Sequence, residues 1–297
     1  MAMPVLTAIL AAMITCLATT PLSMWLAARI GATDEPGAIK IHSSTMPRLG
    51  GLAIFVSSVV GLIAGLISTE SLLVSAIPLL LGSAVIALVG MTDDVLCISP
   101  SVKVLGGILA AATYVMVSRL LGFTQSEEIA TTMLVVTVLT IGLSNSFNLL
   151  DGMDGILAGT TAIVTVGGWF LSVHAGEALW QMAFVSCFGA CLAFLVFNFP
   201  PAKTFMGDGG SLFLGYWVAI GVYELGFSGL VPSQTAWRFA LLLGVPIADT
   251  AFAIVRRIRS GRSISGGDRR HIYDRIHAVF GQSVVKTNLL TYSLSII

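Results

Sequence analysis

The sequence predicts an all-α fold, a polytopic bundle of about ten transmembrane helices. Hydrophobic residues make up 56% of the 297 residues, charged residues only 10%, and the mean hydropathy is +0.94. A soluble domain carries about 25% charged residues. A packed core does not explain so large a deficit, whereas lipid as the solvent does. Because no stretch is polar or long enough for a separate soluble domain, we expect one membrane domain over residues 1–297.

The individual spans follow from the length of each apolar segment, since a helix needs about 20 mainly apolar residues to cross a bilayer. The expected spans are 4–28, 50–68, 72–91, 103–121, 129–147, 156–173, 179–198, 211–227 and 237–255. The first is expected to remain in place, because no basic region precedes it and it is longer than the apolar part of a signal peptide. The stretch 283–297 is short for a crossing, which indicates either a partial span or a chain that continues.

The charged residues sort onto the two ends of these spans. The loops after odd-numbered spans, with the adjacent span ends, hold thirteen of the fifteen Lys and Arg residues. The positive-inside rule therefore predicts that this face is cytoplasmic. The same face receives all nine Asp residues, whereas five of the six Glu residues fall on the other. Acidic residues contribute little to orientation, so this segregation instead indicates a site that binds metal and phosphate.

Two adjacent carboxylates, Asp93 and Asp94, lie at the cytoplasmic end of the third span. They repel each other, so the pair is costly unless a cation or a polar cavity compensates. One of them is expected to bind Mg²⁺ or the proton of a substrate, and the other to position it. The alternative is a capping pair that begins the next segment.

The loop sequence NLLDGMDG contains Asn148, Asp151 and Asp154. The two aspartates are three residues apart, so they share a face on a helical turn. The glycines between them permit a close approach of the backbone to a ligand. The alternative is an ordinary loop rich in Asp and Gly, which is less common between two apolar spans.

The loop after the seventh span reads FNFPPAKTFMGDGGS. Lys203 supplies a positive charge, and the turn around Asp208 can present both a carboxylate and backbone N–H groups to a phosphate or metal. Phe205 is placed to stack on a nucleobase. Loops of this composition also serve as simple connectors.

The last large loop, 256–281, holds seven arginines and two histidines. Its first part, RRIRSGR, is typical of a juxtamembrane patch that holds topology or contacts anionic lipid. In the second part His271 alternates with Asp268, Arg270 and Asp274, a pattern suited to hold a diphosphate or to protonate a leaving group.

The first loop offers a smaller set of candidates. Lys40, His42 and Arg48 are expected near the same face. They are candidates for phosphate contacts, with plain topology signals as the alternative.

These motifs, in this order, resemble the polyprenyl-phosphate N-acetylhexosamine-1-phosphate transferases, glycosyltransferase family 4. The matching elements are PRLGG, DD, NxxDGMDG, FNxPPAKxFMGDxGS and PxxD, and they extend from about Lys40 to about His277. The resemblance implies ten or eleven helices with an active site at the cytoplasmic face of the bacterial inner membrane. It also implies transfer of a sugar-1-phosphate, such as that of GlcNAc, from a UDP-sugar to undecaprenyl phosphate. The products would be undecaprenyl-diphospho-sugar and UMP, which initiates synthesis of a cell-surface polysaccharide.

The resemblance also implies roles for individual residues. Asp93 or Asp94 would be a base or a phosphate-positioning group, His271 would be catalytic, and Mg²⁺, with Mn²⁺ as the alternative ion, would bind Asp208 and Asp94. The expected substrate-binding residues are Lys40, His42, Lys103, Asn148, Asp151, Asp154, Phe205 and Arg270. The expected partners are the UDP-N-acetylhexosamine, the polyprenyl phosphate and membrane lipid, with no nucleic acid and with a homodimer as a compatible assembly.

Three positions depart from the family pattern, namely Cys97, Gly107 and the HIYDR segment, where Tyr273 and Asp274 stand in place of histidines. The HIYDR difference argues against the related phospho-N-acetylmuramoyl-pentapeptide transferase. A transporter or flippase of an anionic lipid or metabolite is the alternative from another class, and it would place charges near the bilayer midplane. A catalytically inactive member of the family is a further alternative.

Overall fold

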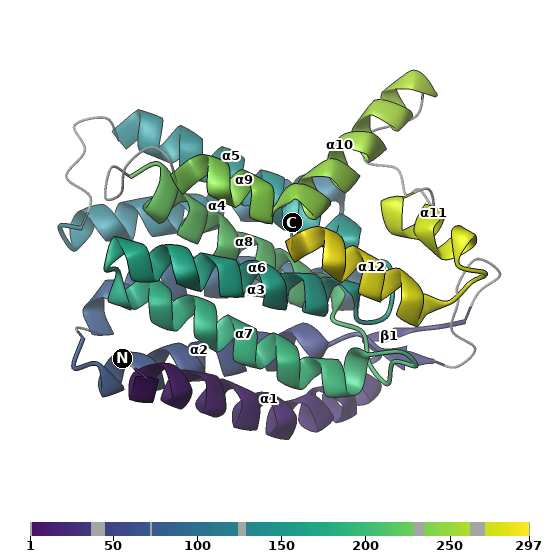
Figure 1. The fold of residues 1–297 in the computed structure, drawn as a ribbon, viewed down its shortest axis with the longest axis horizontal. Coiled ribbons are helices and arrows are strands. Elements are labelled where there is room, and N and C mark those ends of the chain that lie inside the picture. The colour runs from purple at the N-terminus through teal and green to yellow at the C-terminus, as the bar shows by residue number, and fades with distance from the viewer. Residues whose placement is uncertain are drawn as a thin grey trace.

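The computed structural model describes residues 2–36, 45–71, 73–123, 129–228, 235–261 and 271–296. Over these residues the chain is a bundle of helices, which confirms the all-α expectation (Figure 1). The helices are α1 Ala2–Ile30, α2 Gly50–Ser68, α3 Ile77–Leu96, α4 Pro100–Leu120, α5 Ile129–Leu150, α6 Ile156–Ala175, α7 Ala178–Asn198, α8 Gly207–Gly226, α9 Thr235–Leu242, α10 Gly244–Arg259, α11 Ile272–Val279 and α12 Val284–Ile296, with a 3₁₀ turn, η1, at Leu73–Ala76. Two short strands, β1 Thr33–Asp34 and β2 Met46–Pro47, pair antiparallel.

The membrane spans agree with the sequence expectation over most of the chain. Among the described residues, seven helices are long and apolar enough to cross a membrane: α1, α2, α3 with its preceding turn, α4, α5, α6 and α7. The expected span 211–227 corresponds to α8, which is not among the seven because glycines, tyrosines and the acidic Asp208 and Glu224 make it less apolar. Helix α12 lies within the stretch 283–297 and has 13 described residues, fewer than the roughly twenty that a crossing needs.

The expected ninth span, 237–255, differs from the prediction. The chain forms two helices, α9 and α10, that meet at Leu243 with a bend of 70°. Pro246 lies in the first turn of α10, and because proline has no backbone N–H it favours a helix start over a continuous helix. As a result α10 projects away from the bundle (Figure 1). At most this bent pair forms an eighth span.

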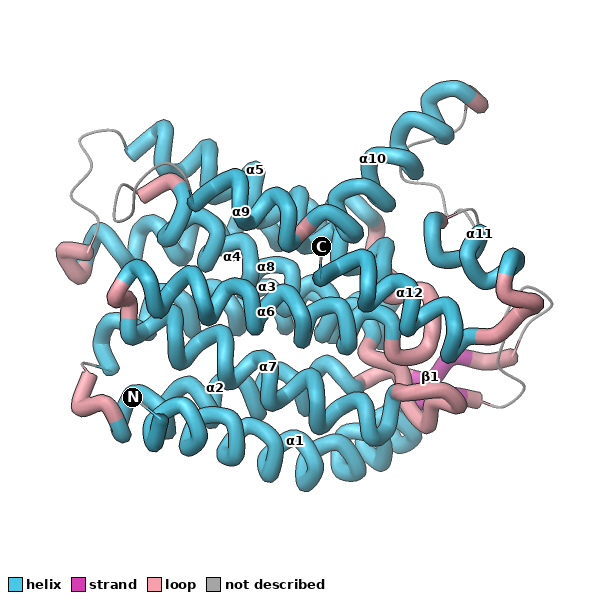
Figure 2. The backbone as a smooth tube through the Cα atoms, viewed as in Figure 1, coloured by secondary structure: helices cyan, strands magenta, loops and turns pink. Residues whose placement is uncertain are grey.

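Consecutive helices run back and forth along the long axis, so that the loops after α1, α3, α5 and α7 gather at one end. Figure 2 shows these loops together with the two short strands. Helix α8 packs against α2, α3, α5 and α6, and 18 of its 20 residues are buried. The bundle therefore surrounds α8 and directs its N-terminus, with Asp208, toward the end where the loops meet.

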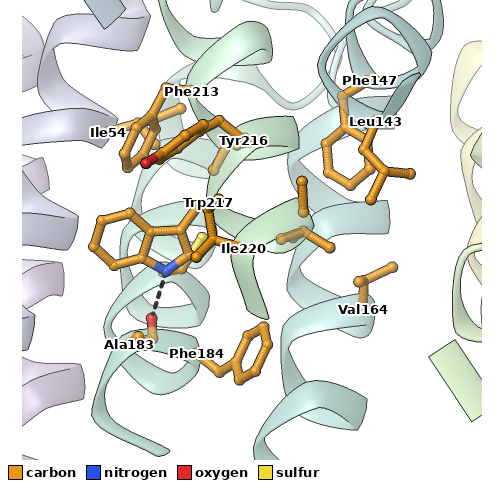
Figure 3. Close-up of a cluster of buried hydrophobic side chains, with 14 of the residues drawn as sticks. Ile54, Leu143, Phe147, Val164, Ala183, Phe184, Phe213, Tyr216, Trp217 and Ile220 are labelled. Atoms are coloured by element: carbon orange, nitrogen blue, oxygen red, sulfur yellow. Dashed lines mark hydrogen bonds between the residues drawn. The ribbon is translucent and has the colours of Figure 1, made fainter. Parts of the chain in front are cut away.

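Large aromatic side chains fill the space around α8 (Figure 3). The rings of Phe213 and Trp217 are 5.2 Å apart, and Trp217 Nε1 donates a hydrogen bond of 3.1 Å to the carbonyl oxygen of Ala183 in α7. A buried indole N–H needs such a partner. These contacts fix the rotation of α8 about its axis.

Glycines bring the neighbouring helices close to the first turn of α8. A Cβ on Gly90 of α3 would lie 2.6 Å from Gly209 Cα, and a Cβ on Gly51 of α2 would lie 2.7 Å from the carbonyl carbon of Gly209. Real side chains do not approach backbone atoms so closely. Small residues at such positions allow helix backbones to approach each other in a membrane protein.

We expect Gly90→Ala to destabilise the protein by about 1–3 kcal/mol, because the added methyl group would push α3 away from α8. Gly142→Ala in α5 is the matched control, since a Cβ there meets nothing within 4 Å, and alanine is the better helix former. Thermal unfolding of the purified variants measures the difference. Equal unfolding midpoints for the two variants would contradict the packing argument.

Candidate active site

Three carboxylates and two cationic side chains meet at the N-terminus of α8. Lys103 Nζ of α4 donates hydrogen bonds of 2.8 Å to Asp208 Oδ2 and 3.2 Å to Asp93 Oδ2. Arg48 Nη2 lies 3.5 Å from Asp94 Oδ1 and 3.8 Å from Asp208 Oδ1. The structure therefore brings Asp93, Asp94, Lys103 and Asp208 together, as the sequence predicted, and adds Arg48. We call these five residues the carboxylate cluster.

Asp94 occupies a particular position in this cluster. Its Oδ1 accepts a hydrogen bond of 2.8 Å from the backbone N–H of Asp208, and its Oδ2 accepts one of 2.9 Å from that of Gly209. The first N–H groups of a helix have no partner within the helix, and a carboxylate there also interacts favourably with the helix dipole. The alternative interpretation of a capping pair was thus partly correct, but Asp94 caps α8 and not the next segment.

The PRLGG segment, residues 47–51, forms hydrogen bonds with the backbone just before α8. The backbone N–H groups of Gly50 and Gly51 donate hydrogen bonds of 3.1 Å and 2.7 Å to the carbonyl oxygens of Phe205 and Met206. In return, the N–H of Phe205 donates one of 2.8 Å to the carbonyl oxygen of Pro47. This pairing places Arg48 beside Asp208. Phe205 itself is half-buried, and its backbone connects the loop after α7 to β2.

The end of α5 and the following loop adjoin the cluster. Asn148 Nδ2 donates a hydrogen bond of 3.0 Å to Ser211 Oγ in the first turns of α8. Asp151 lies just beyond α5 and retains some exposed surface. Desolvation by the surrounding protein, and then the negative charges of Asp208 and Asp94, raise the pKa of Asp151 well above its ordinary value. Asp151 therefore shares the electrostatic environment of the carboxylate cluster.

Asp154 makes a different kind of contact. Its Oδ2 accepts a hydrogen bond of 3.0 Å from the backbone N–H of Ala202, and its carbonyl oxygen accepts one of 2.7 Å from Asn288 Nδ2. The residue thus connects the loop after α5 with the loop after α7 and with α12. Its predicted contact with a substrate stays a prediction.

A second polar group surrounds His271 at the start of α11. His271 Nδ1 lies 2.6 Å from Asp249 Oδ2, and the backbone N–H of Ile272 donates a hydrogen bond of 2.6 Å to Asp249 Oδ1. Both side chains are buried. Because a carboxylate oxygen only accepts hydrogen bonds, the contact with Asp249 favours a proton on Nδ1.

Tyr273 connects this group to the loop beside the cluster. Its ring is stacked on the imidazole of His271 with centroids 5.3 Å apart, and its OH donates a hydrogen bond of 3.3 Å to Leu149 O. A Cβ on Gly152 would collide with the same phenol. The departure of the HIYDR segment from the family pattern thus provides a tyrosine that fastens α11 to the loop carrying Asp151.

Sequence reasoning named Arg48 only as a candidate for phosphate contacts, and it missed Asp249 as a site residue. The signals were present in PRLGG and PxxD, but nothing in the sequence showed that Arg48 meets carboxylates more than 40 positions away or that Asp249 meets His271. Three predicted site residues, Lys40, His42 and Arg270, lie outside the described residues.

The cluster suits a divalent cation that takes few protein ligands. Within the described parts of the chain no group of three His, Cys, Asp or Glu residues forms a ready metal cage. Mg²⁺ does not need one, since it keeps several waters and binds one or two carboxylates together with substrate phosphates. Asp93 Oδ1 is buried and has no hydrogen-bond partner among the described residues. Asp93 shares Lys103 with Asp208, so this oxygen and the Asp208 carboxylate are the donors that fit such an ion.

Comparison with known proteins tests the family that the motifs imply. A family model described as glycosyl transferase family 4 matches residues 76–226, which include α3 to α8 and most of the carboxylate cluster. The chain belongs to glycosyl transferase family 4. The resemblance drawn from the motifs is therefore confirmed.

The similarity to individual members of this family extends beyond residues 76–226. The chain is 36% identical to the probable undecaprenyl-phosphate N-acetylglucosaminyl 1-phosphate transferase of Bacillus subtilis, over 99% of this chain and 82% of the relative. It is 32% identical to the decaprenyl-phosphate N-acetylglucosaminephosphotransferase of Mycobacterium tuberculosis, over 95% of this chain and 77% of the relative. The phospho-N-acetylmuramoyl-pentapeptide-transferase of Bacillus cytotoxicus is 36% identical over 61% of this chain and 62% of the relative.

The two adjacent aspartates should differ in their contribution to stability. In Asp94→Asn an amide NH₂ would face one of the two backbone N–H groups of α8, at a cost of about 1–3 kcal/mol. Asp93→Asn is the matched control, because its Oδ1 has no hydrogen-bond partner and loss of its charge relieves repulsion. Thermal unfolding should show a lower midpoint for Asp94→Asn only, and the reverse order would refute the capping role.

Asp249 should determine the tautomer of His271. In Asp249→Asn the side-chain oxygen can still accept from Ile272, but the NH₂ then faces Nδ1 and favours the tautomer with the proton on Nε2. Nitrogen-15 NMR of histidine-labelled protein, with His271→Gln to assign the signal among the four histidines, reads the tautomer directly. An unchanged tautomer in Asp249→Asn would show that Asp249 does not position the imidazole.

Proposed function

We propose that this membrane protein transfers an N-acetylhexosamine-1-phosphate, with GlcNAc as the sugar, from a UDP-sugar to undecaprenyl phosphate. The observation that carries the proposal is the relationship to N-acetylglucosamine phosphotransferases over nearly the whole chain. The similarity to a phospho-N-acetylmuramoyl-pentapeptide-transferase covers only about three fifths of the chain. The HIYDR segment also departs from that enzyme, so the N-acetylhexosamine is the better-supported sugar.

The proposed reaction joins two anions. An oxygen of the lipid phosphate forms a bond to the β-phosphorus of the UDP-sugar, and the bond from that phosphorus to the oxygen bridging to the α-phosphate breaks. UMP leaves with the bridging oxygen and its electron pair, and undecaprenyl-diphospho-sugar is formed. The acceptor phosphate is largely ionised near neutral pH, since its second pKa is about 6. Charge neutralisation is therefore more important than removal of a proton.

The carboxylate cluster supplies groups for this neutralisation. Among the described residues, Lys103 and Arg48 lie within 4.0 Å of the Asp208 carboxylate, and both suit contacts with phosphate oxygens. We propose that Asp208 and Asp93 hold Mg²⁺, with Mn²⁺ as the alternative ion. When bound, the ion would stabilise the negative charge that develops on the diphosphate.

Asp94 has a supporting part in this proposal. Its oxygens already accept backbone N–H groups, but each carboxylate oxygen has a second lone pair. The earlier expectation that Asp94 also binds the metal therefore stays a prediction. Its main proposed role is to hold the N-terminus of α8 so that Asp208 stays beside Asp93 and Lys103.

The expected cellular location follows from the same observations. Seven or more apolar helices make the chain a multi-pass membrane protein. Bacterial relatives and the sorting of Lys and Arg support the bacterial cytoplasmic membrane, with the carboxylate cluster facing the cytoplasm. On that side a UDP-sugar and the phosphate of a membrane lipid meet at the interface.

The proposal is tested with purified protein, undecaprenyl phosphate, Mg²⁺ and a panel of UDP-sugars, with UMP release as the measured product. We expect turnover with UDP-GlcNAc, loss of turnover with a chelator, and recovery when Mg²⁺ is restored. Asp208→Asn should lower turnover at least about a hundredfold, whereas Glu177→Gln at the start of α7 should not.

Absence of UMP release with every sugar, together with binding of intact lipid, would favour a transporter or flippase. Release with the UDP-muramoyl-pentapeptide alone would assign the chain to the related peptidoglycan enzyme. Near-normal turnover of Asp208→Asn in excess Mg²⁺ would refute its role as a metal ligand.

A further inference from the structure

A pocket separate from the carboxylate cluster lies between α10 and α11. Its volume is about 460 Å³. Three arginines and three apolar side chains make up most of its lining: Arg256, Arg259, Arg275, Phe252, Val255 and Ile272. None of these side chains takes part in the proposed transfer reaction.

The charged side chains in the described lining of this pocket are all arginines. Arg259 and Arg275 are exposed and Arg256 is half-buried. Among the described residues that line the pocket there is no carboxylate. Guanidinium groups bind phosphate oxygens through paired N–H donors, and three of them on one small pocket match an anionic phosphate better than a neutral head group.

The apolar part of the pocket continues along α10. Phe252 and Ile258 are each 61% exposed and Val255 is 44% exposed. This helix leaves the bundle at the 70° bend (Figure 1), and these side chains stay largely exposed. On α10 the arginines and the apolar residues of the pocket are three or four positions apart, so they share one face of the helix. Arginines beside large apolar side chains can keep the guanidinium group at a polar surface while the apolar part is buried, which suits the membrane interface.

The arginines of α10 lie farther from the proposed reaction site than the inner lining of the pocket does. Arg256 follows Asp249 by seven residues on α10, and Arg259 follows it by ten, which places them about 10–15 Å farther along the helix axis. Asp249 contacts His271 directly and therefore gives the position of the His271 group along α10. The pocket therefore begins beside the His271 group, since Ile272 lines it and donates its N–H to Asp249, and Arg256 and Arg259 lie farther out on α10.

We propose that this pocket binds the phosphate of an anionic membrane phospholipid, with the acyl chains along the exposed apolar face of α10. The three arginines recognise the charge, and Phe252 and Val255 contact the glycerol and acyl region. The bound lipid would fasten the projecting helix to the bilayer surface. The proposal does not depend on the sugar or on the acceptor of the transfer reaction.

Native mass spectrometry of the purified protein tests the proposal, with phosphatidylglycerol compared with phosphatidylcholine of the same acyl chains. One arginine near a membrane surface changes binding of an anionic lipid about fivefold, and two change it about thirtyfold. We expect Arg259→Gln/Arg275→Gln to lower affinity for phosphatidylglycerol by that amount and to leave phosphatidylcholine unchanged. Arg119→Gln, an exposed arginine near the end of α4, is the matched control and should bind like the unmodified protein.

Two further measurements guard against a folding defect and a wrong ligand. Arg275→Lys keeps the charge and should retain most of the preference, whereas Arg275→Gln should lose about fivefold. An unchanged preference in the double variant would overturn the proposal. So would a double variant that loses affinity for undecaprenyl phosphate but not for phosphatidylglycerol, because the pocket would then belong to the acceptor.

Discussion

The contact between the Asp94 carboxylate and the first N–H groups of α8 is the interaction on which the site depends. It joins the end of α3 to the beginning of a helix whose residues are nearly all buried. The helix start is thereby placed where Lys103 and Arg48 reach Asp208. Without this contact, Asp93 and Asp208 would be two isolated acidic residues at helix ends.

Burial of α8 has a cost that the surrounding chain offsets with specific contacts. Besides Asp208, the helix contains Glu224, whose carboxylate accepts a hydrogen bond from the OH of Tyr114 in α4. Trp217 is likewise paired through its indole N–H. Polar groups inside a membrane bundle need such partners. The glycines of α2 and α3 allow these helices to approach the first turn of α8, so a less apolar helix can lie among more apolar neighbours.

Much of this arrangement could be predicted from the sequence, because apolar length and charge sorting depend on local composition. The spans over α1 to α7 follow from the twenty-residue rule, and the shared end of the aspartates follows from the alternation of loops. The bend at Leu243 was harder to foresee, since Pro246 in an apolar run is compatible with either a kinked span or a new helix. The hydrogen-bond partners of Asp94, Asp249 and Tyr273 could not be predicted, because each contact joins segments that only the packed bundle brings together.

The capping contact also has a consequence for how the protein is made. Asp94 and the N–H of Asp208 are separated by 114 residues, and a chain is synthesised from its N-terminus. The paired aspartates therefore enter the membrane long before the helix start that stabilises them has left the ribosome. During that interval they depend on water or on Lys103, which follows them closely. The carboxylate cluster can therefore be completed only after α8 has been synthesised.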